Sequence, residues 1–541
     1  MADDRDESLL TFDFEQALPC NTRLHGVYPG HPVRQCMLKA RHVVFVLFCA
    51  ISSGCGSLVL PNDDNHNPYL RAWMQSDETL LSDRSRQHYL KRLALIDSRQ
   101  FRHTQTSLQH HRLTETAQFG KELGELSSAY TLSIRASAMT PLEAKDWDLR
   151  FLLACRLGNR ADAAIALTRI AEQWPAMLSG YSQQTVFWTV YPSSQKDKIE
   201  DDLLSLRLAL YRASWTLDFG VAPAELWAGL AADLALRGKQ NAALEIVAHS
   251  NAPRELLSMR IDKRFDSFIR RRPELFDVAL AAKRRIEDWE AAVKTHPRAL
   301  QAVIELTYAY LDAGRYEDTL TLTESIIERI NRAETFAKEF DDEPTTYNWL
   351  LDNHARALLA LGRWDEARAE FRSAATRKEN GSANMSNAIN FASALTDHGS
   401  GDEAMAILNS VPTEKLSTYG KMQWHRTRLQ AAVTRNDEAL LNDSLTYLKR
   451  HAKDSRSTYL LALVRANRLE TAAHYLIRRL LDIDSRSWAL QLVQNYSDSP
   501  APQELQQQRN NLQKVVLRPD VQYAISEVGH IEQVPLPSEL K

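Results

Sequence analysis

The chain has 541 residues, whereas one hydrophobic core stops growing at roughly 250–300 residues, so the length predicts two or more domains or an extended repeat array. Apolar residues make up 44% and charged residues 25% of the chain, and the 18 glycines and 19 prolines are few, which excludes a generally disordered, collagen-like or low-complexity chain. The 66 basic and 69 acidic residues leave a formal net charge of −3, so the overall charge gives no indication of a nucleic-acid partner.

The one strongly apolar run of the sequence lies near its N-terminus and has the layout of a secretory signal peptide. Residues 37–54 begin with the basic segment MLKAR, continue with the apolar run VVFVLFCAI and end in small residues before Cys55. Nine apolar residues cannot span a bilayer, but counting on to Leu60 gives an uncharged window of 18 residues, which is a marginal transmembrane candidate. Residues 1–36, with the acidic leader MADDRDE, are expected to be a non-native extension.

The motif SSGC at 52–55 resembles the lipobox of bacterial lipoproteins. The resemblance implies that Cys55 receives a diacylglyceryl group and becomes the N-terminus after cleavage, although Ser52 departs from the aliphatic residue that the family usually has there. A cleaved ordinary signal peptide and an uncleaved single-pass anchor are the alternatives. All three place the body of the protein outside the cytoplasm, because Lys39 and Arg41 precede the apolar run and acidic residues follow it.

Two segments separate this signal from the body of the chain. Residues 55–67 form a tether with turn-forming Pro, Asn and Asp residues, and no spaced calcium loop accompanies its paired Asp residues. Residues 68–135 are expected to form a helical N-terminal cap. His110 and His111 lie there, but adjacent helical residues face apart, so we expect surface polarity rather than a metal site. Cys155, the one cysteine of the body, cannot pair within it and is expected in a helix interface.

Residues 136–500 show apolar residues at helical spacing, and a turn motif, GRWDEA at Gly362, returns along the chain. Its copies start at Gly314, Gly399, Thr434 and Asn467, with earlier ones around Gly158 and Gly238. From Gly362 onward the steps are 37, 35 and 33 residues. This pattern, with the small Ala367 where two helices would cross, resembles the tetratricopeptide repeat (TPR), which has about 34 residues per unit. The resemblance implies an all-α fold, a helix–turn–helix repeat solenoid (TPR-like superhelix); an irregular α-helical bundle is the alternative.

The resemblance to TPR also implies which side chains face a partner. In that family, positions two, five, nine and twelve of the first helix of each unit line a groove. These positions are Gln301, Ile304, Tyr308 and Leu311 in one unit and Trp349, Asp352, Arg356 and Leu359 in the next. We expect Tyr308, Trp349, Asp352 and Arg356 to bind the partner, since aromatic and arginine side chains dominate such contacts. The family's carboxylate clamp does not match, because its Lys and Asn positions read Ile304 and Tyr308 here. Tyr308→Ala and Arg356→Ala are expected to leave melting nearly unchanged.

Two further segments depart from the repeat. Residues 333–347, AETFAKEFDDEPTTY, lengthen one step of the repeat and are expected to project as an acidic loop. Residues 501–541 are expected to form a C-terminal cap and a frayed tail.

No GxSxG turn, phosphate-binding glycine loop, HExxH or CxxC motif occurs in the sequence, so we predict no catalytic residue, cofactor or metal. The leading hypothesis is a membrane-tethered extracytoplasmic scaffold or adaptor that binds cell-envelope proteins, lipid-anchored with its body in the periplasm, at the outer rather than the inner membrane. TPR lipoproteins regulate wall synthesis, secretion and envelope assembly, which is what the resemblance implies. The alternative is a component of envelope polysaccharide or secretion machinery that binds glycan or carries a weakly marked enzymatic activity. A cytoplasmic repeat protein with a chance apolar segment is the third hypothesis.

Overall fold

The computed structural model describes residues 83–140, 143–191, 200–332, 339–379, 382–497 and 500–538. These residues form two compact units, an N-terminal unit up to Ala213 and a C-terminal unit from Ser214 onward. The predicted signal peptide, the tether and the lipidation site Cys55 lie outside the described residues and stay predictions.

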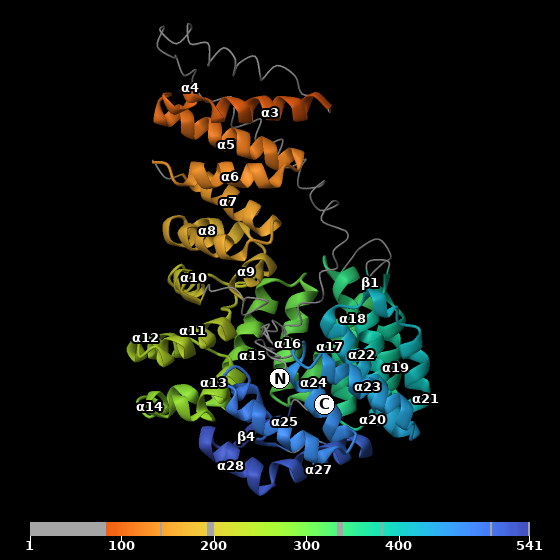
Figure 1. Cartoon of the computed structure of the whole chain (residues 1–541). Helices are drawn as coiled ribbons and strands as arrows, with labels where there is room; N and C mark the ends of the chain where they lie inside the picture. The colour runs from red at the N-terminus through yellow and green to blue at the C-terminus, as the bar shows by residue number, and fades with distance from the viewer. Residues whose placement is uncertain are drawn as a thin grey trace, which may run out of the picture. The chain divides into compact units, whose positions relative to one another are not determined.

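The N-terminal unit is a stack of helices in which successive helices lie against one another (Figure 1). Its elements are α3 (Asp83–Asp97), α4 (Arg99–Arg102), α5 (Thr106–Leu123), α6 (Leu126–Ser137), α7 (Ala144–Arg156), α8 (Arg160–Gln173), the 3-10 helix η3 (Pro175–Gly180), α9 (Gln183–Val190) and α10 (Glu200–Arg212). The pairs α5/α6 and α7/α8 turn at Gly124 and Gly158, whose φ angles are +82° and +72°. The helix–turn–helix pattern therefore begins before residue 136, inside the segment predicted to be a cap.

A buried polar cluster lies in this unit at a position where the sequence predicts surface polarity. His110 is 4% exposed, and its Nε2 pairs with Oδ2 of Asp146 at 2.5 Å. Thr114 donates its hydroxyl to Oδ1 of the same carboxylate at 2.5 Å. The surface prediction is wrong for His110, because α5 packs against α7 and Asp146 supplies the partner that a buried imidazole needs. His111 is exposed, as expected.

The C-terminal unit consists mainly of helix–turn–helix pairs that pack against their neighbours along the chain. Its first half contains α11 (Ala224–Leu236), α12 (Gln240–Val247), α13 (Pro253–Arg260), η4 (Lys263–Phe265), α14 (Asp266–Ile269), η5 (Pro273–Phe276), α15 (Val278–Thr295), α16 (Leu300–Asp312), α17 (Tyr316–Arg332), α18 (Glu343–Ala360) and α19 (Trp364–Thr376). Its second half contains β1 (Lys378–Glu379), β2 (Ser382–Ala383), α20 (Met385–Asp397), α21 (Gly401–Asn409), η6 (Thr413–Lys415), α22 (Thr418–Arg435), α23 (Glu438–Arg450), α24 (Arg456–Arg465), α25 (Leu469–Leu481), α26 (Arg486–Leu492), β3 (Asn495–Ser497), α27 (Gln503–Val516), α28 (Pro519–Val528) and β4 (Gln533–Pro537). The strands form two small pairs, β1 with β2 antiparallel and β3 with β4 parallel. The predicted all-α repeat fold is confirmed.

A residue in the left-handed backbone region reverses the chain within each repeat pair. Gly238, Gly314, Gly362 and Gly399 hold these turns, with φ between +75° and +78°. A Cβ atom in this conformation approaches the following carbonyl oxygen and costs about 1–2 kcal/mol, so glycine makes the turn with the least strain. The predicted repeat phase is confirmed at these four positions.

The next copy of the turn is shifted by two residues from its predicted place. The left-handed residue is Asn436 (φ +54°) and not Thr434, and Asp437 then caps α23 by accepting a backbone hydrogen bond at 2.9 Å. Asparagine enters this backbone region far more readily than a β-branched residue such as threonine. The steps from Gly362 therefore become 37, 37 and 31 residues, the last one ending at Asn467.

The described part of the predicted acidic loop is residues 339–347, of which 343–347 already belong to helix α18. The remaining residues, 339–342, pack against the repeat and do not project. Phe340 is fully buried in a hydrophobic cluster. The carboxylate of Asp342 accepts hydrogen bonds from the backbone N–H groups of Leu300 and Gln301, both at 2.8 Å, and so caps the N-terminus of α16. The prediction of a projecting loop is wrong for these residues, because an aromatic anchor and a helix cap hold them against the array.

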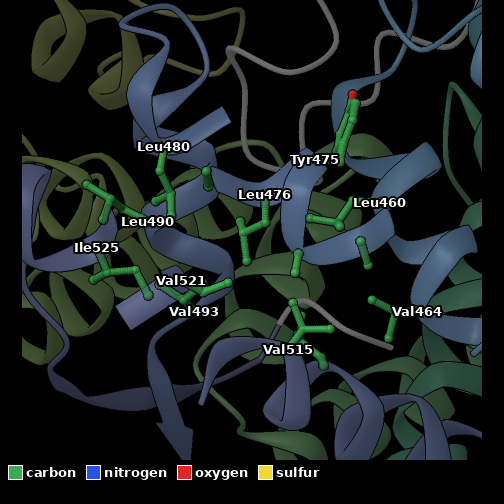
Figure 2. Packing of buried hydrophobic residues seen from close by; sticks show 14 of the residues in the cluster. Leu460, Val464, Tyr475, Leu476, Leu480, Leu490, Val493, Val515, Val521 and Ile525 are labelled. Carbon is green, nitrogen blue, oxygen red and sulfur yellow. The ribbon is translucent and has the colours of Figure 1, made fainter. Parts of the chain in front are cut away.

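Helices α24 to α28 share one hydrophobic core. Figure 2 shows its side chains converging from successive helices: Leu460, Val464, Tyr475, Leu476, Leu480, Leu490, Val493, Val515, Val521 and Ile525. Each Leu, Ile or Val buried in this way contributes roughly 1.5–3 kcal/mol. The segment after residue 500 is therefore an integral part of the packed unit.

Residues near the C-terminus form hydrogen bonds with residues that lie more than 250 positions earlier in the sequence. The backbone N–H of His530 donates to the carbonyl oxygen of Ile261 at 2.9 Å, and Gly529 forms a β-bridge with Asp262. The His530 ring also pairs with Asp266, 264 positions away, at 2.9 Å. The C-terminal segment thus closes the repeat array onto helix α13 and the residues that follow it.

Strand β4 continues the packing of the C-terminal segment against the earlier residues. Val534 and Leu536 are 1% and 2% exposed, and Arg260 pairs with Glu532 at 2.5 Å just before the strand. The tail predicted to be frayed is therefore folded through Ser538.

The close approach at Gly529 gives the first prediction. A Cβ atom there would lie 2.5 Å from the carbonyl oxygen of Ile261 and 2.4 Å from a methyl group of Leu490. We expect Gly529→Ala to lower the free energy of unfolding by roughly 1–3 kcal/mol, as overpacking does. Gly229→Ala is the control: it lies within α11, a Cβ atom there meets nothing within 4 Å, and alanine favours the helix by about 1 kcal/mol. Urea unfolding measures both, and wild-type stability of Gly529→Ala would contradict the close approach.

Candidate functional site

A cavity of about 280 Å³ lies within the C-terminal unit. It is lined by α16, α18, α20, α22 and α24, each of which is the first helix of a repeat pair and packs against the next one. Helices α26 and α27 and strand β3, from the C-terminal part of the chain, bound it on another side. The groove expected from the sequence is therefore a pocket, because the chain's own C-terminal elements cover part of the repeat face.

Two of the four predicted partner-binding residues line this cavity. Tyr308 on α16 and Arg356 on α18 do so, whereas Trp349 and Asp352 do not. Trp349 is 3% exposed and packs in the hydrophobic cluster that contains Phe340. The C-terminal halves of α16 and α18 thus face the cavity, while their N-terminal halves are engaged in core packing.

Asp352 lies behind the cavity wall and holds Arg356 in place. It is 1% exposed and accepts hydrogen bonds from Nε of Arg356 at 2.5 Å and from Nδ2 of Asn390 at 3.1 Å. A carboxylate buried to this extent loses several kcal/mol of hydration, so it depends on these partners. Asp352 is therefore a positioning residue for the arginine that reaches the cavity.

These contacts revise the expectation that substitutions at the two lining residues leave melting unchanged. Arg356→Ala would leave the buried carboxylate of Asp352 without its cationic partner. Tyr308 belongs to a buried cluster and is 9% exposed, so Tyr308→Ala would remove core packing as well.

Helix α22 contributes Tyr419, Gln423, Arg426 and Thr427 to the lining, and none of them was expected from the sequence. Groove positions were expected only in the units before Gly314 and Gly362. With Asn436 as the turn residue, Gln423 and Arg426 are positions two and five of α22. In α20 and α24, positions five and nine line the cavity; they are Ile389, Ser393, Ser457 and Leu461. Counting the groove positions back from the left-handed residue in every unit would thus have found them.

A buried ion cluster connects the cavity wall to the C-terminal segment. Arg465, 5% exposed, lies 3.3 Å from Asp397 and 3.5 Å from Glu504, and it donates to the carbonyl oxygen of Thr396 at 3.2 Å. Burial raises the pKa of the Asp397 carboxyl, and the positive charges of Arg465 and Arg426 partly oppose this rise. Arg465 therefore ties α24 to α20 and α27.

Other predicted features lie elsewhere in the described residues. Cys155 is partly buried, and burial raises the pKa of its thiol to about 12, in keeping with the expected packing role. Within the described ranges, no three His, Cys, Asp or Glu side chains gather in a way that could hold a metal ion. None of the helices that the structure describes combines the length and the apolar character of a membrane span.

No family model matches the sequence, and no curated protein matches it. Among solved structures, the chain is similar to one chain of the crystal structure of the APC/C hetero-tetramer Cut9-Hcn1, with 12% identity, 82% of this chain and 87% of that chain covered, and a TM-score of 0.28. It is also similar to the TPR domain of P58(IPK), with 15% identity, 69% of this chain and 99% of that chain covered, and a TM-score of 0.19. These superpositions are too loose to transfer any residue. The helix pairs and their left-handed turns are those of a TPR-like helical-repeat protein.

The pair formed by Asp352 and Arg356 gives the second prediction. We expect Arg356→Gln and Asp352→Asn each to destabilise the protein, and the double variant to cost less than the sum, with a coupling of about 1–3 kcal/mol in urea unfolding. The physical reason is that either single variant leaves a polar group unpaired in a poorly hydrated place. The exposed pair of Arg363 and Glu366 is the matched control and is expected to couple by no more than about 0.5 kcal/mol. Additive effects at both pairs would contradict the positioning role.

Proposed function

We propose that the protein is a membrane-tethered, extracytoplasmic adaptor whose cavity takes a segment of a partner protein of the cell envelope. The observation that carries this proposal is the convergence of five successive repeats on one cavity, which includes Tyr308 and Arg356. Helical repeat arrays provide such inward-facing surfaces for segments of other proteins. The proposal assigns the site to binding, with no reaction and no cofactor.

The lining of the cavity supports recognition of a protein segment. The partly buried Tyr419 and Trp488 and the mostly buried Tyr308 give the lining its aromatic part, and Asn390 and Gln423 present amide groups that donate and accept hydrogen bonds. Binding sites typically combine an apolar or aromatic lining with a few polar groups of this kind. Such a surface suits a segment that has both apolar and polar side chains.

The membrane tether rests on the sequence between residues 37 and 55. The basic segment, the apolar run and the motif SSGC are the features that support cleavage before Cys55 and its lipidation. Several acyl chains on one residue would anchor the protein stably, whereas a single chain gives marginal binding. This arrangement would present the repeat units to proteins of the same membrane or of the periplasm.

A photo-crosslinking aromatic residue tests the binding role of the cavity. We expect this residue at the position of Tyr419, which is partly buried and lines the cavity, to form covalent adducts with a partner protein in growing cells. The control is the same residue at the position of Tyr523, which is 67% exposed on α28 and does not line the cavity. Mass spectrometry identifies the adducts. The same adducts at both positions, or none at Tyr419, would show that the partner binds elsewhere.

The tether is tested by fatty-acid labelling and intact mass. We expect the mature protein to begin at Cys55 and to carry lipid, and we expect Cys55→Ser to abolish labelling and to release or mislocalise the protein. Wild-type protein that stays unlabelled and retains residues 37–54 would rule out lipidation at this site.

A further inference from the structure

We propose that the partner segment places an acidic side chain, Asp or Glu, in the cavity and that Arg426 pairs with its carboxylate. This inference rests on the proposed function, because it specifies the chemistry of the segment that enters. It assigns to Arg426 a role in selecting the partner.

Arg426 lines the cavity without an ion-pair partner among the described residues. This residue lines the cavity from α22, and its Nη1 donates a hydrogen bond to Oε1 of Gln423 at 3.3 Å. No carboxylate of the described residues lies within ion-pair distance of Arg426. Asp397, which lines the same cavity, is paired with Arg465 at 3.3 Å, and the more distant charge of Arg426 also lowers its pKa. Arg426 therefore brings to the cavity a positive charge that no direct contact with an acidic side chain neutralises.

Arg356 is a second arginine at the cavity whose Nη groups remain available to a ligand. Its Nε is held by Asp352 at 2.5 Å, and the described residues offer its two Nη groups no further hydrogen bond. The pair fixes the direction of the side chain and leaves the end of the guanidinium group available. Because a guanidinium group presents parallel N–H donors that match a carboxylate, a second arginine on the same cavity adds to the attraction for an acidic group.

The charged residues of the whole lining also favour an anionic occupant. Four arginines line the cavity, Arg254, Arg356, Arg426 and Arg509, against two aspartates, Asp312 and Asp397. Attraction between charges is stronger in a partly enclosed site than in open water, since less solvent screens it. The cavity thus favours an anionic group and disfavours a basic one.

The size of the cavity limits what else the occupant can be. Its volume of about 280 Å³ lies just below the range of about 300–1,000 Å³ that small-molecule pockets span. Leu359, Ile389 and Leu461 give the cavity an apolar part. The segment that enters therefore places an apolar side chain next to its acidic one.

A random octapeptide library, displayed on phage and selected on the purified full chain, tests this inference. We expect the selected peptides to be enriched in Asp or Glu at one position with the wild-type chain and with Arg435→Gln, and to lose this enrichment with Arg426→Gln. Arg435 is the matched control, since it lies on the same helix and pairs with Asp402 outside the cavity. Fluorescence polarisation of the best peptide is expected to show at least tenfold weaker binding to Arg426→Gln.

The peptide also provides a test that needs no variant protein. Replacing its acidic residue by the amide, Glu by Gln or Asp by Asn, is expected to weaken binding to the wild-type chain at least tenfold and to have little further effect on Arg426→Gln. If Arg426→Gln fails to fold, as circular dichroism would show, Arg426→Lys replaces it and is expected to retain part of the affinity. Equal losses with wild type and Arg426→Gln would overturn the assignment of Arg426.

The remaining outcomes separate this inference from the proposed function. Peptides without acidic residues that crosslink to the position of Tyr419 would overturn the acidic occupant while leaving the cavity as a protein-binding site. Binding of succinate that depends on Arg426, with no peptide selected, would assign the cavity to free organic acids and overturn the peptide as the source of the carboxylate. If neither succinate nor any peptide bound the cavity, the proposed function would fail together with the inference.

Discussion

The contact between the C-terminal segment and residues 260–266 joins two parts of the C-terminal unit that are far apart in the sequence. The backbone of His530 and Gly529 joins Ile261 and Asp262, and the buried strand β4 follows. Because these residues belong to opposite ends of the unit's sequence, the contact limits how far the repeats between them can open. It also brings α26, α27 and β3 against the repeat face, so that the first helices line a bounded cavity and not an open groove.

The arginines in and around the cavity differ in their ion pairs. Arg465 is buried, is shared by Asp397 and Glu504, and holds three helices together. Arg356 and Arg426 reach the cavity, one held from behind by Asp352 and the other without a direct carboxylate partner. Burying an unmatched charge is costly, so an arginine is kept at the edge of a cavity where water or a ligand can neutralise it. The buried Arg465 therefore stabilises the packing of the helices, whereas Arg356 and Arg426 at the cavity can bind an anionic ligand.

Local backbone chemistry explains how much of the site the sequence predicts. A glycine in the left-handed region marks most of the turns, and asparagine marks the turns at Asn436 and Asn467. The helical period then fixes which residues of the preceding helix point inward. This reasoning placed Tyr308 and Arg356 on the inner face, and both line the cavity. The turn between α22 and α23 was assigned to Thr434, whereas Asn436 forms it. An asparagine can occupy several positions of a turn, so an asparagine in the sequence identifies the left-handed turn residue of a repeat less reliably than a glycine does.

Residues close together in the chain set the hydrophobic period and the turn geometry, so the helix–turn–helix repeat and the cavity-facing side of the C-terminal halves of α16 and α18 could be predicted from the sequence. Which of the inward residues a ligand can reach follows from the tertiary structure. Trp349 and Tyr308 belong to the same buried cluster, yet only Tyr308, in the C-terminal half of its helix, also borders the cavity. That outcome depends on segments that pack from outside the repeat, such as residues 339–342 and the returning C-terminus. Contacts across such separations leave no period in the sequence, so they are visible only once the chain has folded.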